Sequence, residues 1–444
     1  MFLPVAIMRA GNLNEPDTFW AVRAGQLIWA QHALPTSDAL SWTAFGHQWT
    51  LSSWIFDLLL AGANALGGMA GIAIMCAAFA ALLAALLVYL ARRIGSRPWL
   101  PGILLILVVP LYFPRISAAP QLMDFLAASL LILLLKRMQV TDEPALVMGW
   151  LFLLMLVWAN LHSSAVLGVA IVFIFAVVGL VLSNDHFRQF AAWVAVPVSA
   201  LAVLFNPYGA ALYTHFSYVA PASSAFVAEW QPLNFADPAS LVSLLIGCTG
   251  LVLAVRRNDM AFISALAATI IASLLVVRLL PLAVLLAVPV IAAAISYGRV
   301  FEFMRRHHVV FVPPAIAALL ALWVVAVPQL SHPGQPDGAS FPRELVATVP
   351  VGCPLYNTDI IGSYVTLARP DVRVSLDTRL SVYGETLVRK AVHGLDGLLP
   401  LANAVTYARC ALVPVDSGLA KSLAASPAWQ LTGRQGDYVL FRLS

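Results

Sequence analysis

Ten apolar runs, each long enough or nearly long enough to cross a bilayer, fill the middle of this 444-residue chain. They cover residues 69–91, 98–113, 121–136, 145–161, 164–183, 189–206, 239–255, 260–277, 279–297 and 309–328. A bilayer core about 30 Å thick needs about 20 apolar residues in a helix. Only 10% of the residues are charged, against about 25% in an average soluble domain. The pattern therefore predicts a polytopic α-helical membrane protein.

The first eight residues, MFLPVAIM, are apolar but too short to cross a membrane. Either part of a first helix is missing, or the chain begins on the outer side. We favour an incomplete first helix, because the loop that follows needs an anchor on the cytoplasmic side. The expected total is then 11 crossings instead of 10.

Basic residues are distributed unequally between the two sides of this predicted bundle. One side holds 11 of them, namely Arg92, Arg93, Arg97, Lys136, Arg137, Arg188, Arg256, Arg257, Arg299, Arg305 and Arg306. The loops of the other side hold Arg9, Arg23, Arg115 and Arg278. Because basic residues accumulate in cytoplasmic loops, we expect the opening loop, the 207–238 loop and the C-terminal tail to be extracytoplasmic. The net charge of +4 gives no indication of a nucleic-acid partner.

The composition changes near residue 333, where a linker with turn-forming residues begins. Short β-like runs follow, namely CPLYNT, VRVSLDT, CALVPV and YVLFRL, with helical stretches such as SGLAKSLAAS between them. We expect three regions: a first loop with interfacial helices at 1–68, a transmembrane domain at 69–328 and an α/β domain at 329–444. Cys353 and Cys410 could form a disulfide if this domain is exported, but the sequence cannot supply the geometry.

The opening loop concentrates acids and tryptophans in an otherwise charge-poor chain. TFWAVRAGQLIWAQ predicts a short interfacial helix with Trp anchors, and SSWIFDLLLAG predicts a second short helix before the first full span. Glu15 and Asp17 flank Pro16 at the head of the loop. In one interpretation both acids are simply solvated. In the other they face one locus, where they could act as a general base or hold one divalent cation.

Further polar residues fall at the same predicted face: Arg115, Asp124, Asn160, His162, Glu229, Trp230 and Arg278. Each alone has an ordinary explanation, such as a turn hydrogen bond for His162 or snorkelling for the arginines. Together they indicate a site, because ionisable groups at membrane depth are costly and tend to mark function. Two arginines suit an anionic headgroup, since guanidinium pairs bidentately with phosphate.

The order of several short motifs resembles the bacterial GT-C superfamily of integral-membrane glycosyltransferases, in an uncharacterised branch. The matching segments are EPDTFW, RAGQLIW, LPTSDALSW, AAPQLMDFLAASLLILLL, WANLHSS, LFNPYGAALY, AEW, RLLPLAVLLAVP, YNTDIIGSYV, VSLDTRLSVYG and ALVPVDSGLAKSLA. They cover nearly the whole chain. The sequence departs from the pattern in three segments: Ala21 replaces a frequent His, Ser163 and Ser164 replace Gly, and IGSYV is a looser match to a Gly-Gly pair.

The resemblance implies an activity and a role for each candidate residue. It implies inverting transfer of a sugar from a polyprenyl-phosphate or polyprenyl-diphosphate donor to a glycan, lipid or protein acceptor at the outer face of the bacterial inner membrane. Asp17 would be the catalytic base with Glu15 as its partner, or the two would bind a divalent cation. Arg115 and Arg278 would neutralise the leaving phosphate. The expected substrate-binding residues are His162, Asn160, Glu229, Trp230, Trp20 and Asp124, although interfacial anchoring is the favoured explanation for Trp20.

Two other classes of function stay open at this point. A transporter or flippase of a lipid-linked or anionic substrate needs charged groups at mid-membrane depth and broken helices in matching halves. A non-catalytic subunit of polysaccharide assembly would use the outer α/β domain to bind a partner. The polar residues gather at one face, and the proline-interrupted spans show no halved symmetry, which favours the enzyme.

Overall fold

The computed structural model describes residues 13–296, 308–331, 333–338 and 340–444, together with residues 7, 302 and 306. The question of an incomplete first helix therefore lies outside the described residues, as do Arg9, Arg299 and Arg305. The described chain divides into two compact units. The membrane unit comprises residues 1–12, 69–216 and 227–334, and the outer unit comprises residues 13–68, 217–226 and 335–444.

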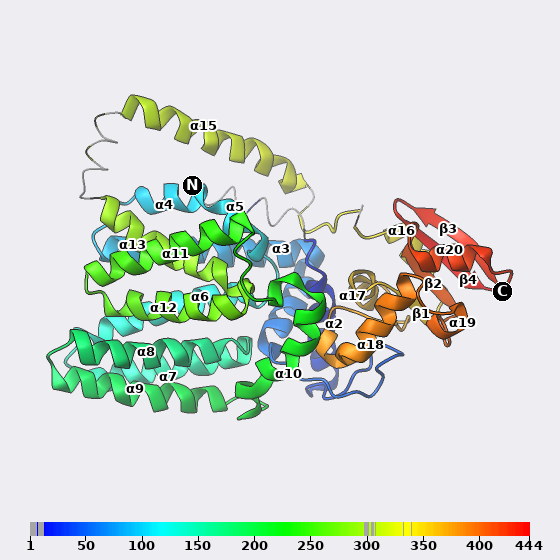
Figure 1. The fold of residues 1–444 in the computed structure, drawn as a ribbon, viewed down its shortest axis with the longest axis horizontal. Helices are drawn as coiled ribbons and strands as arrows, with labels where there is room; N and C mark the ends of the chain where they lie inside the picture. The colour runs from blue at the N-terminus through cyan, green and yellow to red at the C-terminus, as the bar shows by residue number, and fades with distance from the viewer. Residues whose placement is uncertain are drawn as a thin grey trace. The chain divides into compact units, whose positions relative to one another are not determined.

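The membrane unit is built of helices (Figure 1). They are α4 (Leu100–Leu107), α5 (Val109–Tyr112), η1 (Phe113–Arg115), α6 (Gln121–Met138), α7 (Pro144–Leu161), α8 (Ala165–Leu182), α9 (His186–Leu204), η2 (Ala228–Trp230), α11 (Pro238–Arg256), α12 (Met260–Leu275), η3 (Val277–Leu279), α13 (Leu280–Ile295), α15 (His308–Ala326) and η4 (Val327–Ser331). The long helix α3 (Trp54–Arg93) and helix α10 (Ala211–Phe226) each contribute residues to both units.

Each of the ten predicted runs contains a helix, and the protein is a polytopic α-helical membrane protein. By length and apolar composition, six helices of the described chain can cross a membrane: α3, α7, α8, α9, α11 and the segment Val277–Ile295. The run at 98–113 is divided into α4 and α5, with Pro110 in the first turn of α5. Helix α12 is apolar but shorter than these six, and α6 carries three charged residues.

Small residues allow close packing inside the membrane unit. A Cβ at Gly250 of α11 would lie 2.6 Å from the Cβ of Ala287 in α13, and one at Gly247 would lie 3.3 Å from that of Ala283. Such glycines let two helix backbones approach each other, as is common between membrane helices. Lys136 of α6 pairs with Asp259 at the start of α12 at 2.7 Å. The two helices are thereby joined at their predicted cytoplasmic ends.

The outer unit is an α/β unit with a four-stranded sheet in the order β1-β2-β4-β3. The strands are β1 (Leu355–Asn357), β2 (Cys410–Pro414), β3 (Trp429–Gln435) and β4 (Tyr438–Leu443), and only the β1–β2 pair is parallel. The helices of this unit are α2 (Pro16–Gln31), α16 (Arg343–Thr348), α17 (Asp359–Ala368), α18 (Leu380–Leu395), α19 (Leu401–Ala404) and α20 (Gly418–Ala425). The α/β fold expected for the tail is confirmed.

Two details of the predicted strand pattern were wrong. Residues 372–378 form no strand, because Asn357 and Ser375 exchange side-chain hydrogen bonds with each other's backbone where a ladder would otherwise run. Only Val374 makes isolated bridges there. Strand β3 was missed because most of its side chains are at least partly exposed, so its sequence lacks an apolar signal.

Helix α2 of the opening loop packs against α17 of the tail through an aromatic cluster. The ring of Phe19 lies 5.0 Å from that of Phe341 and 5.2 Å from that of Tyr364. Gly25 allows α2 to contact α3, because a Cβ there would clash with the carbonyl oxygen of Asp57. The predicted helix at the head of the loop is therefore confirmed, and it forms part of the core of the outer unit.

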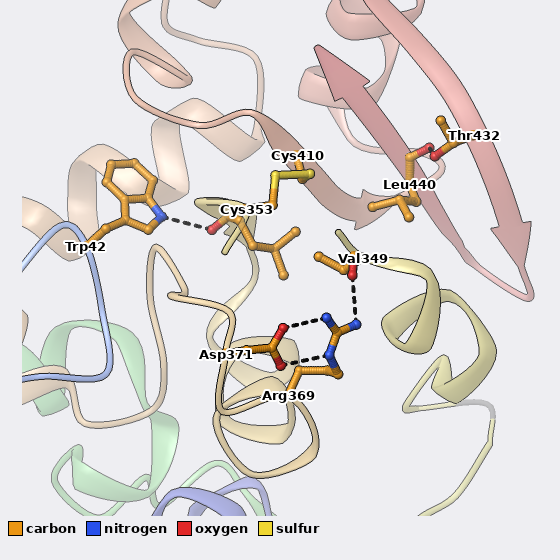
Figure 2. The surroundings of a disulfide bond; sticks show 9 residues. Trp42, Val349, Cys353, Arg369, Asp371, Cys410, Thr432 and Leu440 are labelled. Carbon is orange, nitrogen blue, oxygen red and sulfur yellow. Dashed lines mark hydrogen bonds and ion pairs between the residues drawn. A yellow bond between two sulfur atoms is a disulfide. The ribbon is translucent and has the colours of Figure 1, made fainter. Parts of the chain in front are cut away.

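A disulfide joins Cys353 to Cys410 in strand β2 (Figure 2). Figure 2 also shows Arg369 pairing with Asp371 and donating to the carbonyl oxygen of Val349. Arg369 thereby holds the end of α16 close to the end of α17. The segment between these helices and the sheet is thus fixed both covalently and by charged hydrogen bonds.

Candidate functional site

Asp17 lies in the first turn of α2, with Pro16 as the first helical residue and Glu15 as the N-cap. Its Oδ1 accepts a hydrogen bond from Thr378 Oγ1 at 2.5 Å and another from Trp20 Nε1 at 3.0 Å. Thr378 is in turn held by Ser363, whose Oγ lies 2.9 Å from Thr378 Oγ1. The carboxylate is therefore fixed in one orientation by residues of both the opening loop and the tail.

Trp20 contacts this group through its indole N–H. The N–H lies within hydrogen-bonding distance of both Asp17 and Thr378, at 3.0 and 3.1 Å. Its ring meets that of Trp49 edge-on, with the centroids 6.3 Å apart. Trp49 is itself only 4% exposed, so it packs in the interior of the outer unit. Trp20 thus helps to orient the carboxylate of Asp17.

Other acids lie near Asp17 within the outer unit. Burial raises the pKa of Asp359, and the negative charges of Asp377 and Asp17 raise it further, although backbone hydrogen bonds act in the opposite direction. Among the residues that the structure describes, no group of three or more His, Cys, Asp or Glu side chains is arranged to hold a metal ion. The acids around Asp17 therefore do not complete a cation site by themselves.

In the membrane unit, Asp124 of α6 accepts hydrogen bonds at both carboxylate oxygens. Trp158 Nε1 donates to its Oδ1 at 2.9 Å, Ser164 Oγ donates to the same oxygen, and His162 Nδ1 lies 2.7 Å from Oδ2. Asp124 is 2% exposed, whereas the side chain of His162 is 23% exposed. A histidine that donates Nδ1–H to a buried carboxylate presents Nε2 as a proton acceptor. The pair can thus accept and return a proton.

Asn160 lies beside this group at the end of α7 and is buried. Its Nδ2 donates to the carbonyl oxygens of Leu156 and Phe205, each at 2.8 Å. These contacts fix the end of α7 to the end of α9. They hold the turn that carries His162 and Ser164 in place.

Arg115, Glu229 and Arg278 form an ion-pair group on three short 3₁₀ helices. Arg115 Nη1 contacts Glu229 Oε1, and Arg278 Nη1 lies 3.6 Å from Glu229 Oε2. Arg278 also lies over the ring of Trp230, 5.8 Å from its centroid, and Trp230 stacks on Phe216. The three charged side chains are 19–30% exposed. They therefore remain accessible to an anion from outside.

The structure brings together some of the predicted site residues. Arg115, Glu229, Trp230 and Arg278 form one group and Asp124, Asn160 and His162 another, both in the membrane unit. Glu15, Asp17 and Trp20 belong to the outer unit. The convergence of the acids of the outer unit with the two groups of the membrane unit stays a prediction.

Four residues that contact the candidate groups were not predicted as site residues: Thr378, Ser363, Trp158 and Ser164. All four lie in the segments that carry the resemblance, namely VSLDTRLSVYG, YNTDIIGSYV and WANLHSS. Ser363 and Ser164 stand where the pattern departs from glycine. Each supplies a hydroxyl to a candidate group. These departures from glycine were therefore the feature of the sequence that could have identified Ser363 and Ser164 as site residues.

Solved structures that are similar to this chain include the following three. Two are of the oligosaccharyltransferase from Archaeoglobus fulgidus, one in the apo form (TM-score 0.60) and one of AglB in complex with an inhibitory peptide and a dolichol-phosphate (TM-score 0.63). Each is 12% identical to this chain, and the alignment covers 92% of this chain and 66% of the oligosaccharyltransferase chain. The third, ArnT from Cupriavidus metallidurans in the apo state, has a TM-score of 0.62 at 13% identity. The alignment covers 99% of this chain and 95% of the ArnT chain. These enzymes are GT-C glycosyltransferases.

The chain has the GT-C fold. At 12–13% identity the likeness shows the fold alone. The chain spans about two thirds of the length of the oligosaccharyltransferase chains, 66% in each case. No protein-family model matches the sequence, and no curated protein sequence matches it. The resemblance of the sequence to GT-C proteins is thus confirmed as to fold, while the branch and the activity stay predictions.

Proposed function

We propose that this GT-C protein transfers a sugar from a polyprenyl-phosphate or polyprenyl-diphosphate donor to a cell-envelope acceptor. The observation that carries the proposal is the convergence of Arg115 and Arg278 on Glu229. Two guanidinium groups and one carboxylate leave a net positive charge in a partly exposed position. Such a group suits a lipid phosphate, which arginine binds through paired hydrogen bonds.

The phosphate is the part of the donor that gains charge as the sugar leaves. Hydrogen-bond donors and positive charges of the protein that are already in place when this charge develops stabilise the transition state. They often supply the largest part of a rate enhancement. Arg115 and Arg278 are held by Glu229 and by Trp230. Their guanidinium groups are thus fixed in place before the substrate binds. Glu229 would also compete with phosphate, which keeps the site closed to weakly charged ligands.

Asp17 is the proposed base. Thr378 and Trp20 occupy its Oδ1 and set its orientation, so that the carboxylate can take the proton of an acceptor hydroxyl through Oδ2. The acceptor oxygen then attacks the anomeric carbon, the bond from that carbon to the phosphate oxygen breaks, and the configuration inverts. A base positioned in this way contributes a factor of about 10²–10⁴.

The similar structures support the lipid donor and the acceptor. The archaeal oligosaccharyltransferase was solved with a dolichol-phosphate and an inhibitory peptide. We propose a polyprenyl phosphate as the corresponding lipid of this chain, embedded in the bilayer. The acceptor is a glycan, lipid or protein of the envelope.

The proposed location is the bacterial inner membrane, with the outer unit on the extracytoplasmic side. The distribution of basic residues supports this orientation. The disulfide between Cys353 and Cys410 supports it independently, because disulfides persist in oxidising compartments and are rare in the cytosol.

A divalent cation is the other use that the sequence predicts for Glu15 and Asp17. Mg²⁺ prefers an octahedral set of about six oxygen ligands. Asp17 Oδ1 already accepts two hydrogen bonds, and no metal cluster is assembled among the described residues. The residues present do not complete such a site, so every step of the proposed mechanism is assigned to side chains.

The proposal is tested with the full chain in lipid nanodiscs and a panel of polyprenyl-phosphate sugars. We expect Arg278→Gln and Arg115→Gln each to weaken binding of polyprenyl phosphate about tenfold or more, since each removes a charged hydrogen bond. We expect Asp17→Asn to leave binding unchanged while release of polyprenyl phosphate falls about 10²–10⁴-fold. Arg188→Gln, on the predicted cytoplasmic side, is the matched control. Normal release in Asp17→Asn would remove the base from the mechanism, and sugar movement across the bilayer without release would indicate a transporter.

A further inference from the structure

A cavity of about 230 Å³ lies inside the outer unit, apart from the candidate groups described above. It is lined by residues 42–43 of the opening loop, by Tyr356 of β1 and residues 375–376, by the face of α18 that carries Tyr383, Leu387 and Lys390, and by the region of α19 around Asn403 and Tyr407. Its volume is below the range of about 300–1,000 Å³ that is common for drug-sized ligands. It therefore fits one small unit, such as a single sugar ring.

Trp42 and Tyr407 form an aromatic wall of this cavity. Trp42 Nε1 donates to the carbonyl oxygen of Leu355 at 3.1 Å, which fixes the indole ring against the sheet (Figure 2). Tyr407 meets Trp42 edge-on, with the ring centroids 6.3 Å apart, and is 73% exposed. A rigid aromatic face with an open approach suits the apolar C–H face of a pyranose ring and loses little conformational entropy on binding.

The polar groups of the lining divide into occupied and available ones. Thr43 Oγ1 donates to the carbonyl oxygen of Ser375, and the hydroxyl of Tyr356 donates to that of Ala391. Within the described chain, the ammonium of Lys390, the side-chain amide of Asn403 and the hydroxyl of Tyr407 have no hydrogen-bond partner. Asp and Glu are absent from this lining. The available groups are therefore one cation and two neutral polar groups.

We propose that this cavity binds one negatively charged sugar unit, such as a uronic acid, of an envelope glycan. Trp42 would stack on the face of the ring, Tyr407, which is nearly perpendicular to Trp42, would border the edge of the ring, Asn403 would bind its hydroxyls, and the ammonium of Lys390 would pair with its carboxylate. We choose a negatively charged ligand because the lining contains the cation of Lys390 and no Asp or Glu to pair with it.

The site is independent of the proposed transfer. None of the lining residues belongs to the candidate groups around Asp17, Asp124 or Glu229. A variant without transfer activity should therefore bind the sugar normally. Binding here and catalysis at Asp17 can succeed or fail separately.

The test is saturation-transfer NMR of the full chain in nanodiscs with methyl β-D-glucuronide as the probe. Methyl β-D-glucoside, which lacks the carboxylate, is the matched ligand. We expect saturation of the uronide ring protons, at least about tenfold weaker binding of the glucoside, and a similar loss for the uronide in Lys390→Gln, since charged hydrogen bonds are the strong ones. Asn403→Ala should weaken both ligands. Lys421→Gln, an exposed residue of α20 outside the cavity, and Asp17→Asn should bind as the wild type does.

Two results would overturn the proposal. One is the absence of saturation of either sugar at millimolar concentration. The other is equal binding of uronide and glucoside, with Lys390→Gln unchanged. Because replacing Trp42 by Ala would remove its hydrogen bond to Leu355 and could unfold the wall, Trp42→Phe and Tyr407→Ala are used to test stacking. Normal binding in both of these variants would likewise contradict an aromatic platform.

Discussion

The guanidinium of Arg379 lies 2.8 Å from the carboxylate of Asp38, joining the C-terminal region to the opening loop. Arg379 also pairs with Asp377 at 2.6 Å and lies over the ring of Trp49, 4.3 Å from its centroid. All four residues are at most 4% exposed. Burial alone lowers the pKa of Arg379, but Asp377, Tyr383 and Asp38 raise it overall. The opening loop and the tail are therefore held together by a buried charge network within one unit.

Replacing Arg379 tests whether this network stabilises the outer unit. Arg379→Gln leaves the carboxylates of Asp38 and Asp377 buried without their cation, which typically costs about 3–5 kcal/mol of unfolding free energy. Unfolding of the full chain by guanidinium chloride in detergent, monitored by Trp fluorescence, measures the loss of unfolding free energy. Arg389→Gln is the control, because its pair with Glu385 is exposed and worth about 0–1 kcal/mol. Equal losses in the two variants would show that the buried network does not stabilise the unit.

Much of the fold could be predicted because its signals are local. The ten apolar runs contain helices, and three of the four expected strands formed where apolar residues enter a buried sheet. The segment 372–378 could not be assigned, because its partners are the side chains of distant residues such as Asn357. Local periodicity carries no information about such pairings.

The candidate site divides in the same way. Arg115, Glu229 and Arg278 could be chosen from the sequence, since ionisable residues between apolar runs are conspicuous. The pairing of both arginines with Glu229 could not be predicted, because the three residues lie on separate short helices that only the fold brings together. Thr378 is an ordinary residue in the sequence, and only its contact with Asp17 in the fold makes it notable.

The pair formed by His162 and Asp124 offers a second base, and matched variants separate the two candidates. With Asp17 as the base, His162→Gln should lower release of polyprenyl phosphate by no more than about tenfold, whereas Asp17→Asn should lower it about 10²–10⁴-fold. The rate is measured by mass spectrometry in nanodiscs. A large loss in His162→Gln, together with a small loss in Asp17→Asn, would assign the proton transfer to the membrane unit instead. Ser164→Ala should then give a smaller loss of the same kind.

His215 predicts how stability depends on pH. Burial, and then the electrostatic interaction with His162, lower the pKa of His215 from 6.5 to about 4. The unfolded chain therefore takes up this proton before the folded chain does, so stability falls as the pH drops from above 6.5 towards about 4. His215→Gln should reduce the fall in the thermal unfolding midpoint between pH 7 and pH 4, a window set by these two values. His186→Gln, at an exposed position, should retain the wild-type fall; the same fall in His215→Gln would refute the assignment.

The disulfide connects stability to the side of the membrane on which the outer unit folds. Cys353 and Cys410 are 57 residues apart, and a crosslink over such a loop typically contributes about 2–4 kcal/mol by restricting the unfolded chain. The double variant Cys353→Ser with Cys410→Ser should therefore unfold at lower guanidinium concentration than the wild type. Replacement of the free Cys248, which forms no disulfide, by Ser is the control. In cells, mass spectrometry after thiol blocking should find this pair oxidised and Cys76 reduced, because only an exported unit meets an oxidising environment. A reduced Cys353 in freshly prepared membranes would place the outer unit on the cytoplasmic side and would contradict the orientation inferred from the basic residues.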